Sequence, residues 1–196
     1  MVISRREMVK AASVLALAGV GLFGTGSARA DVIDEDPINA RFNQIFQTYE
    51  VGDILSPEDA AFVEEYGRSS GAVQARDSDV FNGSRTVNGV TYYVRGNWYD
   101  DDAGDTLAWH NYGATVQGGS ASAVSQQITV IMCYMAYGLV GASYQVIHKD
   151  EKTNTDYGVN WNAADFAGSY WGVFVSSSMS CYAEIKPYSG STFRVQ

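Results

Sequence analysis

The sequence has few of the side chains that most often form reactive or metal-binding sites. Its 196 residues include two cysteines, Cys133 and Cys181, and two histidines, His110 and His148. The two cysteines alone do not complete a structural zinc site, which takes four ligands. No G-x-S-x-G motif, the signature of a nucleophilic serine, surrounds a serine. The sequence therefore names no catalytic residue. Because a catalytic triad is defined in space, a hydrolase that uses His110 stays an alternative.

Basic residues are scarce as well. Lys and Arg number 13 against 22 Asp and Glu, which gives a formal net charge of −9. Without residues 1–30, which contain four basic residues and one acid, the net charge becomes −12. Nucleic acids and anionic lipid surfaces attract basic proteins, so neither is expected as a partner. An excess of acid also favours solubility.

Long hydrophobic runs are missing too. The two most apolar stretches are residues 11–23 and residues 128–142. A membrane-spanning helix needs about 20 predominantly apolar residues, and both stretches are shorter. The first is typical of a signal peptide. We interpret the second, rich in Ile, Val, Tyr and Met, as a core β-strand, and we expect no membrane span after signal cleavage.

Residues 1–30 have the pattern of an export signal. Residues 4–10, SRREMVK, are followed by the apolar stretch, and residues 28–30, ARA, fit the small-x-small rule for cleavage. This pattern resembles the leader of bacterial proteins exported by the twin-arginine system. The resemblance covers the leader alone. It implies a secreted or cell-wall-associated protein, with the general secretion route as the alternative.

Residues 31–79 differ in composition from the rest of the chain, because they hold 12 acids and 3 bases. A capping residue precedes a proline at Asp36-Pro37 and again at Ser56-Pro57, which is typical of helix starts. Apolar residues then recur at helical spacing in both segments. We predict a short helical hairpin followed by a linker rich in Ser, Gly and Ala.

Residues 80–196 are typical of an antiparallel β-sandwich. Asn88-Gly89 lies between two strand-like runs and predicts a hairpin with a type I′ turn. The polar run at 148–156 suggests a turn, and residues 163–169 suggest a connection between strands. The predicted fold is mainly β, a Greek-key-like antiparallel sandwich preceded by the helical hairpin. We expect residues 80–196 to fold as a domain of their own.

The two cysteines are predicted to pair. Cys133 lies in the apolar run 128–142, and Cys181 lies in a second run that alternates between apolar and polar residues. In an exported protein, two cysteines favour a structural disulfide. Such a bond would join two core strands, and two buried free thiols are the alternative.

Aromatic residues are the main candidates for a binding site. The chain has 4 Trp and 13 Tyr. Rings that have a polar edge often form ligand-binding faces on exported β-sandwiches, although rings also fill cores. The candidate ligand-binding residues are Trp98, Tyr99, Trp109, Tyr112, Trp161 and Trp171.

The densest carboxylate cluster occupies residues 100–105, DDDAGD. Calcium binds six to eight oxygen ligands from carboxylates and carbonyls, so Asp100, Asp102 and Asp105 are candidate Ca²⁺ ligands. No glutamate follows at the spacing of a calcium-binding loop, and a solvated turn is therefore the alternative. No other cofactor is indicated.

These features together favour a secreted or cell-wall-associated, non-enzymatic protein that binds a glycan or another protein at the cell surface. One alternative is a small secreted effector or bacteriocin-like toxin, in which residues 31–79 would be a removable acidic pro-segment. An exported hydrolase is the other alternative.

Overall fold

We describe a computed structural model of the chain. The structure describes residues 32–34, 37–69, 79–100, 107–173 and 175–196. The predicted signal peptide at residues 1–30 and most of the predicted linker lie outside the described residues.

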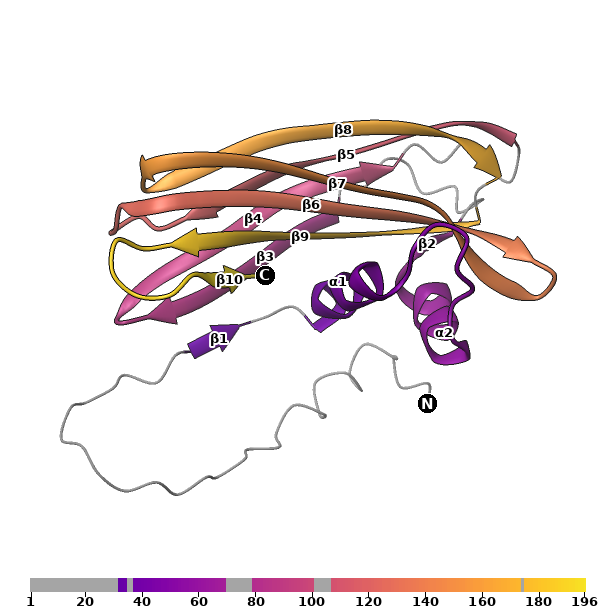
Figure 1. The fold of residues 1–196 in the computed structure, drawn as a ribbon, viewed down its shortest axis with the longest axis horizontal. Coiled ribbons are helices and arrows are strands. Elements are labelled where there is room, and N and C mark those ends of the chain that lie inside the picture. Colours follow the sequence, from indigo (N-terminus) through magenta and orange to yellow (C-terminus); the bar gives the residue numbers. More distant parts are fainter. Residues whose placement is uncertain (1–31, 35–36, 70–78, 101–106, 174) are drawn as a thin grey trace, which may run out of the picture.

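The described residues form mostly long strands, with two helices near the beginning (Figure 1). The elements are β1 (Val32–Asp34), α1 (Pro37–Thr48), α2 (Pro57–Tyr66), β2 (Arg68–Ser69), β3 (Asp79–Val87), β4 (Val90–Asp100), β5 (Leu107–Gly119), β6 (Ser125–Val140), β7 (Ser143–Val159), β8 (Trp161–Val173), β9 (Ser176–Lys186) and β10 (Phe193–Val195).

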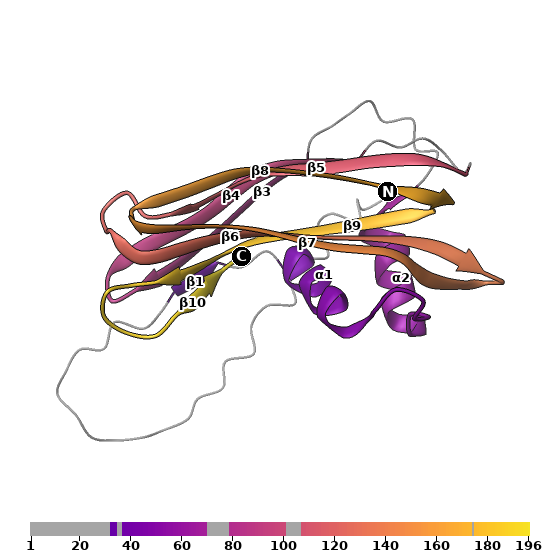
Figure 2. The same ribbon diagram turned by 45° about the horizontal axis from the view of Figure 1, so that its top comes forward.

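The strands form two antiparallel sheets stacked as layers (Figure 2). The open sheet has the strand order β1-β3-β4-β5-β8, and the helix-covered sheet has the order β10-β9-β6-β7, with β2 beside β9. The chain passes from one sheet to the other after β1, β2, β5, β7 and β8. This architecture confirms the predicted mainly β, antiparallel sandwich preceded by helices.

The predicted β-hairpin is confirmed, while two predicted connections are strands. Val87 lies opposite Val90, and Asn88 (φ 52°) and Gly89 (φ 80°) have the left-handed backbone that a type I′ turn requires. The polar run 148–156 lies within β7, and 163–169 lies within β8. Both are edge strands, and an edge strand can carry polar or small residues because one side of it has no neighbouring strand.

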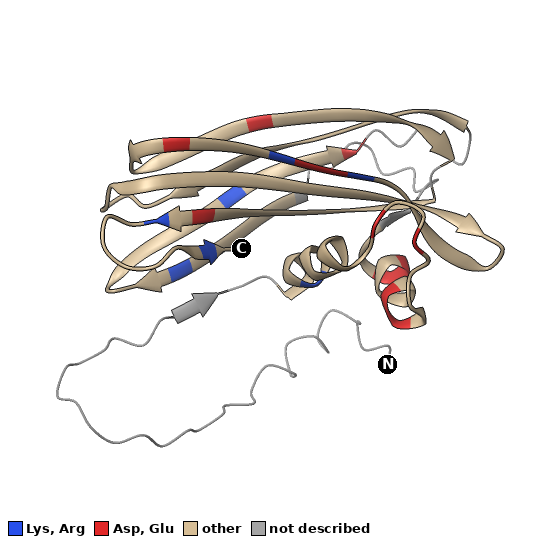
Figure 3. Ribbon diagram, in the orientation of Figure 1, with Lys and Arg blue, Asp and Glu red and all other residues tan. Residues whose placement is uncertain are grey.

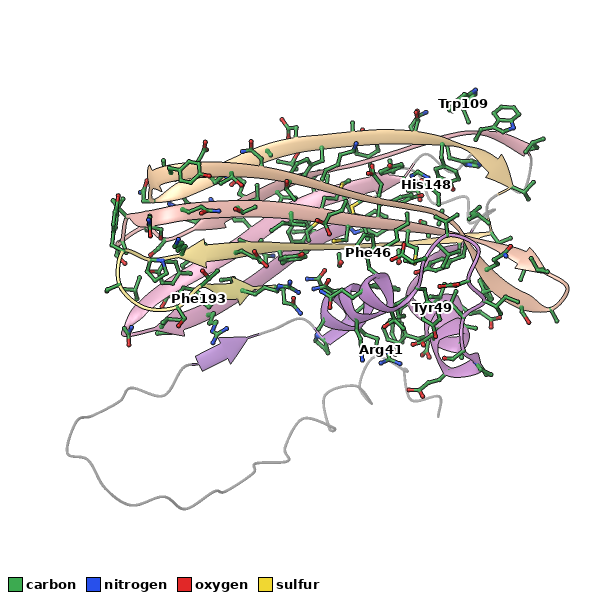
Figure 4. The ribbon with its side chains drawn as sticks, in the orientation of Figure 1. Arg41, Phe46, Tyr49, Trp109, His148 and Phe193 are labelled. Carbon is green, nitrogen blue, oxygen red and sulfur yellow. The ribbon has the colours of Figure 1, made fainter. Side chains whose placement is uncertain are left out.

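Side-chain hydrogen bonds fix the start of α2 and join it to α1. Ser56 Oγ accepts from the backbone amide of Asp59 at 3.1 Å and donates to the Asp59 carboxylate at 2.8 Å, so Ser56 is the N-cap of α2. The same carboxylate accepts from the hydroxyl of Tyr49 and from the guanidinium of Arg41, each at 2.7 Å. Figure 4 labels Arg41 and Tyr49 beside the two helices.

Strand β6 is buried on both of its faces, which explains why residues 128–142 are apolar without alternation. One face contributes Val130, Met132 and Tyr134 to the core between the sheets. The other face packs against the helices. This second core consists of Phe42, Ile45, Phe46, Leu55 and Val63 from the helical segment together with Ile131, Cys133, Met135, Tyr137, Val146 and Tyr182 from the sheet.

Helix α1 also covers a gap in the edge of β9. Strands β2 and β10 pair with the two ends of the outer edge of β9, and within the described residues no strand pairs with the middle of that edge. There the Asn39 amide donates to the backbone oxygen of Cys181 and accepts from its N–H, both at 3.0 Å. The helical segment therefore completes the sheet as well as its core.

The predicted disulfide between Cys133 and Cys181 is wrong, because both cysteines are free thiols. Strands β6 and β9 are neighbours, but Met132 lies opposite Cys181, and Ser180 lies opposite Cys133. Residues opposite one another share a face, and successive residues alternate between faces. The Cys181 side chain therefore lies in the core between the sheets, and the Cys133 side chain lies under the helices.

We expect both thiols to be unreactive in the native protein and reactive after unfolding without reductant. Burial, the largest cause, raises the pKa of Cys133 to about 12 and the pKa of Cys181 well above its ordinary value, and only a thiolate reacts readily. Counting labelled thiols in denaturant, with and without reductant, tests this. Equal counts are expected, and two fewer thiols without reductant would contradict the register of β6 and β9.

Candidate functional site

Exposed aromatic rings gather on the outer face of the open sheet. Trp109 on β5 and Trp171 on β8 lie directly opposite each other, and they are 61% and 54% exposed. Their ring centroids are 5.7 Å apart in an edge-to-face arrangement. Figure 4 shows Trp109 pointing away from the sandwich. We call these two rings, together with Tyr99, the aromatic strip.

Tyr99 extends the aromatic strip onto β4. It lies opposite Gly113 of β5 and is 44% exposed, and its ring covers the site where a side chain on residue 113 would stand. Gly113 is four positions after Trp109, which is roughly 13 Å along a strand. Asn111 and Ser169, which are opposite each other and exposed, lie between Tyr99 and the Trp pair.

Among the described residues, the outer-face neighbours of the strip on β5 and β8 are uncharged. Leu107 and Val173 lie opposite each other beyond the Trp pair, and they are 59% and 49% exposed. The charged residues on the outer face of the open sheet near these strands, Arg95 and Asp165, lie farther along the strands (Figure 3), whereas Asp100 at the end of β4 points into the sandwich. Asp101, Asp102 and Asp105 lie outside the described residues. The strip is therefore a surface of exposed rings, two of them packed edge to face, with amide and hydroxyl groups between the Trp pair and Tyr99.

The other predicted ligand-binding residues are not part of the strip. Tyr112 is buried and Trp98 packs against the core between the sheets. Trp161 is half-buried at the far end of β8, where the guanidinium of Arg95 lies 5.3 Å from its ring centroid. The structure thus brings together Tyr99, Trp109 and Trp171.

The predicted calcium ligands are described only in part. Asp100 is the last residue of β4, and its carboxylate lies inside the sandwich, where it accepts from Tyr134 at 2.9 Å and from Ser177 at 2.5 Å. Asp102 and Asp105 lie outside the described residues. Within the described part of the chain, no group of three His, Cys, Asp or Glu residues could hold a metal ion. A calcium site at this turn stays a prediction.

A polar cluster between the sheets was missed from the sequence. Tyr112 donates to Asp150 Oδ2 at 2.5 Å and lies 3.0 Å from His148 Nε2. Since the hydroxyl has one proton and gives it to Asp150, His148 Nε2 must be the donor to Tyr112. The Tyr112 hydroxyl fits there because position 168 is glycine, where a Cβ would be 2.3 Å from it.

Stacked rings connect this cluster to the buried carboxylate of Asp100. The rings of Tyr112 and Tyr134 stack at 3.8 Å, and Tyr134 donates to Asp100. On the other side, Tyr170 stacks between His148 at 4.6 Å and His110 at 5.1 Å. His110 is fully buried, and its Nε2 lies 3.2 Å from the carbonyl oxygen of Gly172.

We expect the stability of the fold to decrease as the pH falls through the ordinary pKa of His148, which is 6.5. Burial lowers the pKa of His148 more than the nearby Asp150 raises it. The unfolded chain therefore takes up a proton at a higher pH than the folded chain does, and this uptake favours unfolding. The stability that neutral His148 contributes is present above its unfolded pKa and lost below it.

His148→Gln isolates this contribution, because the glutamine amide can still donate to Tyr112. The melting temperature of the native protein should drop between about pH 7.5 and about pH 5, and the variant should show a smaller drop. Circular dichroism melts at the two pH values measure both. An identical drop in the two proteins would show that His148 is not the responsible group.

None of the helices in the described residues is long and apolar enough to cross a membrane. No protein-family model, no curated protein and no solved structure matches the chain, so its function is argued from the geometry of the site.

Proposed function

We propose that this protein binds a neutral glycan at the cell surface through the aromatic strip of Tyr99, Trp109 and Trp171. The proposal includes export, which the twin-arginine-like pattern of residues 1–30 supports. Binding, rather than catalysis, is the proposed activity.

The observation that carries the proposal is the exposure of two adjacent indole rings. Trp is usually mostly buried in a soluble protein, whereas Trp109 and Trp171 are 61% and 54% exposed on a sheet face that no described element covers. Maintaining such a surface has a cost in solubility, and exposed apolar patches commonly mark interaction sites. The Trp pair is therefore best explained by a ligand.

The shape and polarity of the strip favour a sugar chain. The flat C–H faces of sugar rings stack on aromatic rings, while their hydroxyl groups bond to polar side chains at the ring edges. Here Asn111 and Ser169 lie between the Trp pair and Tyr99. An extended sugar chain could therefore contact the Trp rings, then the polar side chains, and then the Tyr99 ring. The net charge of −12 without residues 1–30 opposes an acidic polysaccharide.

The packing does not favour the alternative functions. Removing residues 31–79 as a pro-segment would expose the apolar outer face of the helix-covered sheet, including Ile131, Met135 and Tyr137. A hydrolase that uses His110 would need an accessible imidazole, but His110 is fully buried beside Tyr170.

We expect Trp109→Ala and Trp171→Ala each to weaken glycan binding about 5- to 30-fold, because each removes roughly 1–2 kcal/mol of stacking. Affinity electrophoresis in gels that contain chitin, cellulose or xylan derivatives measures the loss. Tyr157→Ala is the matched control, since Tyr157 is an exposed ring (70%) on the other sheet. Equal retardation of all the proteins, or no retardation in any gel, would contradict the proposal.

A further inference from the structure

Among the described residues, most edges of the two sheets are protected in different ways, and β8 is the longest edge that is not. An unprotected edge strand tends to pair with another chain, so proteins shorten, charge or cover their edges. Strands β1 and β10 are each 3 residues long. The middle of β9 is covered by Asn39.

Strand β7 is protected twice. Its first residues pair with the α1–α2 connection, where Gly52 N–H donates to the Val146 oxygen at 2.8 Å and Leu55 N–H donates to the Tyr144 oxygen at 3.0 Å. Farther along, residues 149–152 read Lys-Asp-Glu-Lys. These charges favour solvent over a neighbouring strand.

Strand β8 has none of these protections. It is 13 residues long, contains no proline and carries one charge, Asp165 (Figure 3). Its pairing with β5 is continuous from Trp161 to Val173, with no bulge to twist the edge away. Within the described residues, no strand pairs with its other side.

We propose that β8 pairs with β8 of a second copy of this chain, antiparallel and symmetric about Ala167. Ala167 is the midpoint of the strand, so all 13 residues would pair. The two open sheets would then form one continuous sheet across a twofold axis. A two-fold interface requires a self-complementary surface, and the sequence of β8 has this property.

On the outer face of the joined sheet, Trp161 would lie opposite Val173 at each end, and the pairs nearer the axis would combine a large or charged residue with a small or polar one. In this register Trp171 is opposite Ala163 of the second copy, and Asp165 is opposite Ser169, whose hydroxyl can donate to the carboxylate. All four side chains are exposed in the single chain, so pairing would not require them to leave a core.

The inner face shows the same complementarity. Tyr170 would lie opposite Ala164, Phe166 opposite Gly168, and Asn162 opposite Gly172, so each bulky side chain meets a small residue. Two neighbouring symmetric registers lose this match. Symmetry about Asp165 would place two carboxylates face to face, and symmetry about Phe166 would place that ring opposite itself, both of which are unfavourable.

The interface would be held mainly by backbone hydrogen bonds, at roughly one per residue pair. Its area is small for a permanent dimer, so we expect a dissociation constant in the range of about 1–100 µM. Dimerisation would place two aromatic strips on the same face. Trp171 of one copy lies beside Ala163 of the other, so the two Trp171 rings would be about 27 Å apart along the strands, which permits bivalent binding of a polymer.

Two substitutions at Ser169 test the proposed register. Ser169→Asp would put a carboxylate opposite Asp165 of the second copy twice per dimer, whereas Ser169→Lys would put an ammonium there. We expect the first to weaken dimerisation about three- to tenfold and the second to strengthen it by a similar factor at low salt. Sedimentation velocity of the mature chain over a range of concentrations measures both, and circular dichroism verifies that each variant is folded.

Ala167→Lys is an independent test, because it places two ammonium groups at the twofold axis while the exposed side chain leaves the monomer unchanged. This variant should be monomeric at concentrations where the native protein is dimeric. The proposal is overturned if the native protein stays monomeric up to about 200 µM. It is also overturned if the native protein dimerises but the Ser169 and Ala167 variants dimerise with unchanged affinity, because the dimer then uses another surface.

Discussion

A fragment of residues 80–196 is expected to aggregate and to lack a cooperative thermal transition. The core beside the helix-covered sheet contains five side chains from the helical segment: Phe42, Ile45, Phe46, Leu55 and Val63. Each of them is at most 7% exposed to solvent. Burying an apolar side chain contributes roughly 1.5–3 kcal/mol. Five of them contribute about as much as the whole stability of an ordinary domain, roughly 5–15 kcal/mol.

The fragment would also lose the hydrogen bonds of Asn39 to β9 and the two short strands that the segment adds to the sheets. A bare apolar sheet face and an open sheet edge are both routes to aggregation. This expectation from the packing replaces the one from composition, in which the acidic segment and the linker suggested two independent units.

A chain cut within residues 70–78 is the matched control for the fragment. If packing and not chain continuity matters, the cut chain should stay soluble and melt cooperatively with both pieces bound, whereas the fragment alone should not. Light scattering and circular dichroism distinguish the two outcomes. A soluble fragment with a cooperative melt would show that the β domain is autonomous.

Asp100→Ala is expected to destabilise the fold by about 3–5 kcal/mol, which corresponds to a melting temperature lower by roughly 10 °C. The Asp100 carboxylate is 8% exposed and accepts from the hydroxyls of Tyr134 and Ser177. Alanine would leave both hydroxyls buried without this acceptor, and hydrogen bonds to a charged group contribute about 1.5–3 kcal/mol each.

Asp100→Asn is the matched control, because it keeps the shape and one oxygen acceptor while removing the charge. Its loss should be about half that of the alanine variant. Chemical unfolding with urea measures both free energies of unfolding. If the alanine variant lost less than about 1 kcal/mol, the buried network would not contribute to stability as we describe.

Local patterns in the sequence predicted the fold class and several elements. The type I′ turn at Asn88-Gly89 and the cap of α2 at Ser56 depend on neighbouring residues only. The prediction of a core strand in the apolar run 128–142 was also confirmed, as strand β6. It depended on the length of the run, which is too short to span a membrane. Edge strands were harder to predict, since the polar run in β7 and the small residues of β8 resemble turns.

The alignment of neighbouring strands could not be predicted from the sequence. The incorrect predictions for the cysteine pair and for Tyr112 as a surface residue follow from that. A shift of one residue moves a side chain to the opposite face. This is why Cys133 and Cys181 do not meet, and why Tyr112 points inward while Trp109, three residues earlier on β5, points outward. The sequence also offered no signal for the contact of Tyr112 with Asp150, which joins strands of different sheets.

The most direct test of the proposed glycan site follows the indole N–H signals of the four tryptophans by NMR. Soluble oligosaccharides of chitin, cellulose and xylan would be added to the isotope-labelled mature chain. We predict that one of these ligands shifts the signals of Trp109 and Trp171 together and leaves that of Trp98, which packs against the core, in place. No shift with any of these neutral glycans, or shifts only in Trp98 and Trp161, would contradict glycan binding at the aromatic strip.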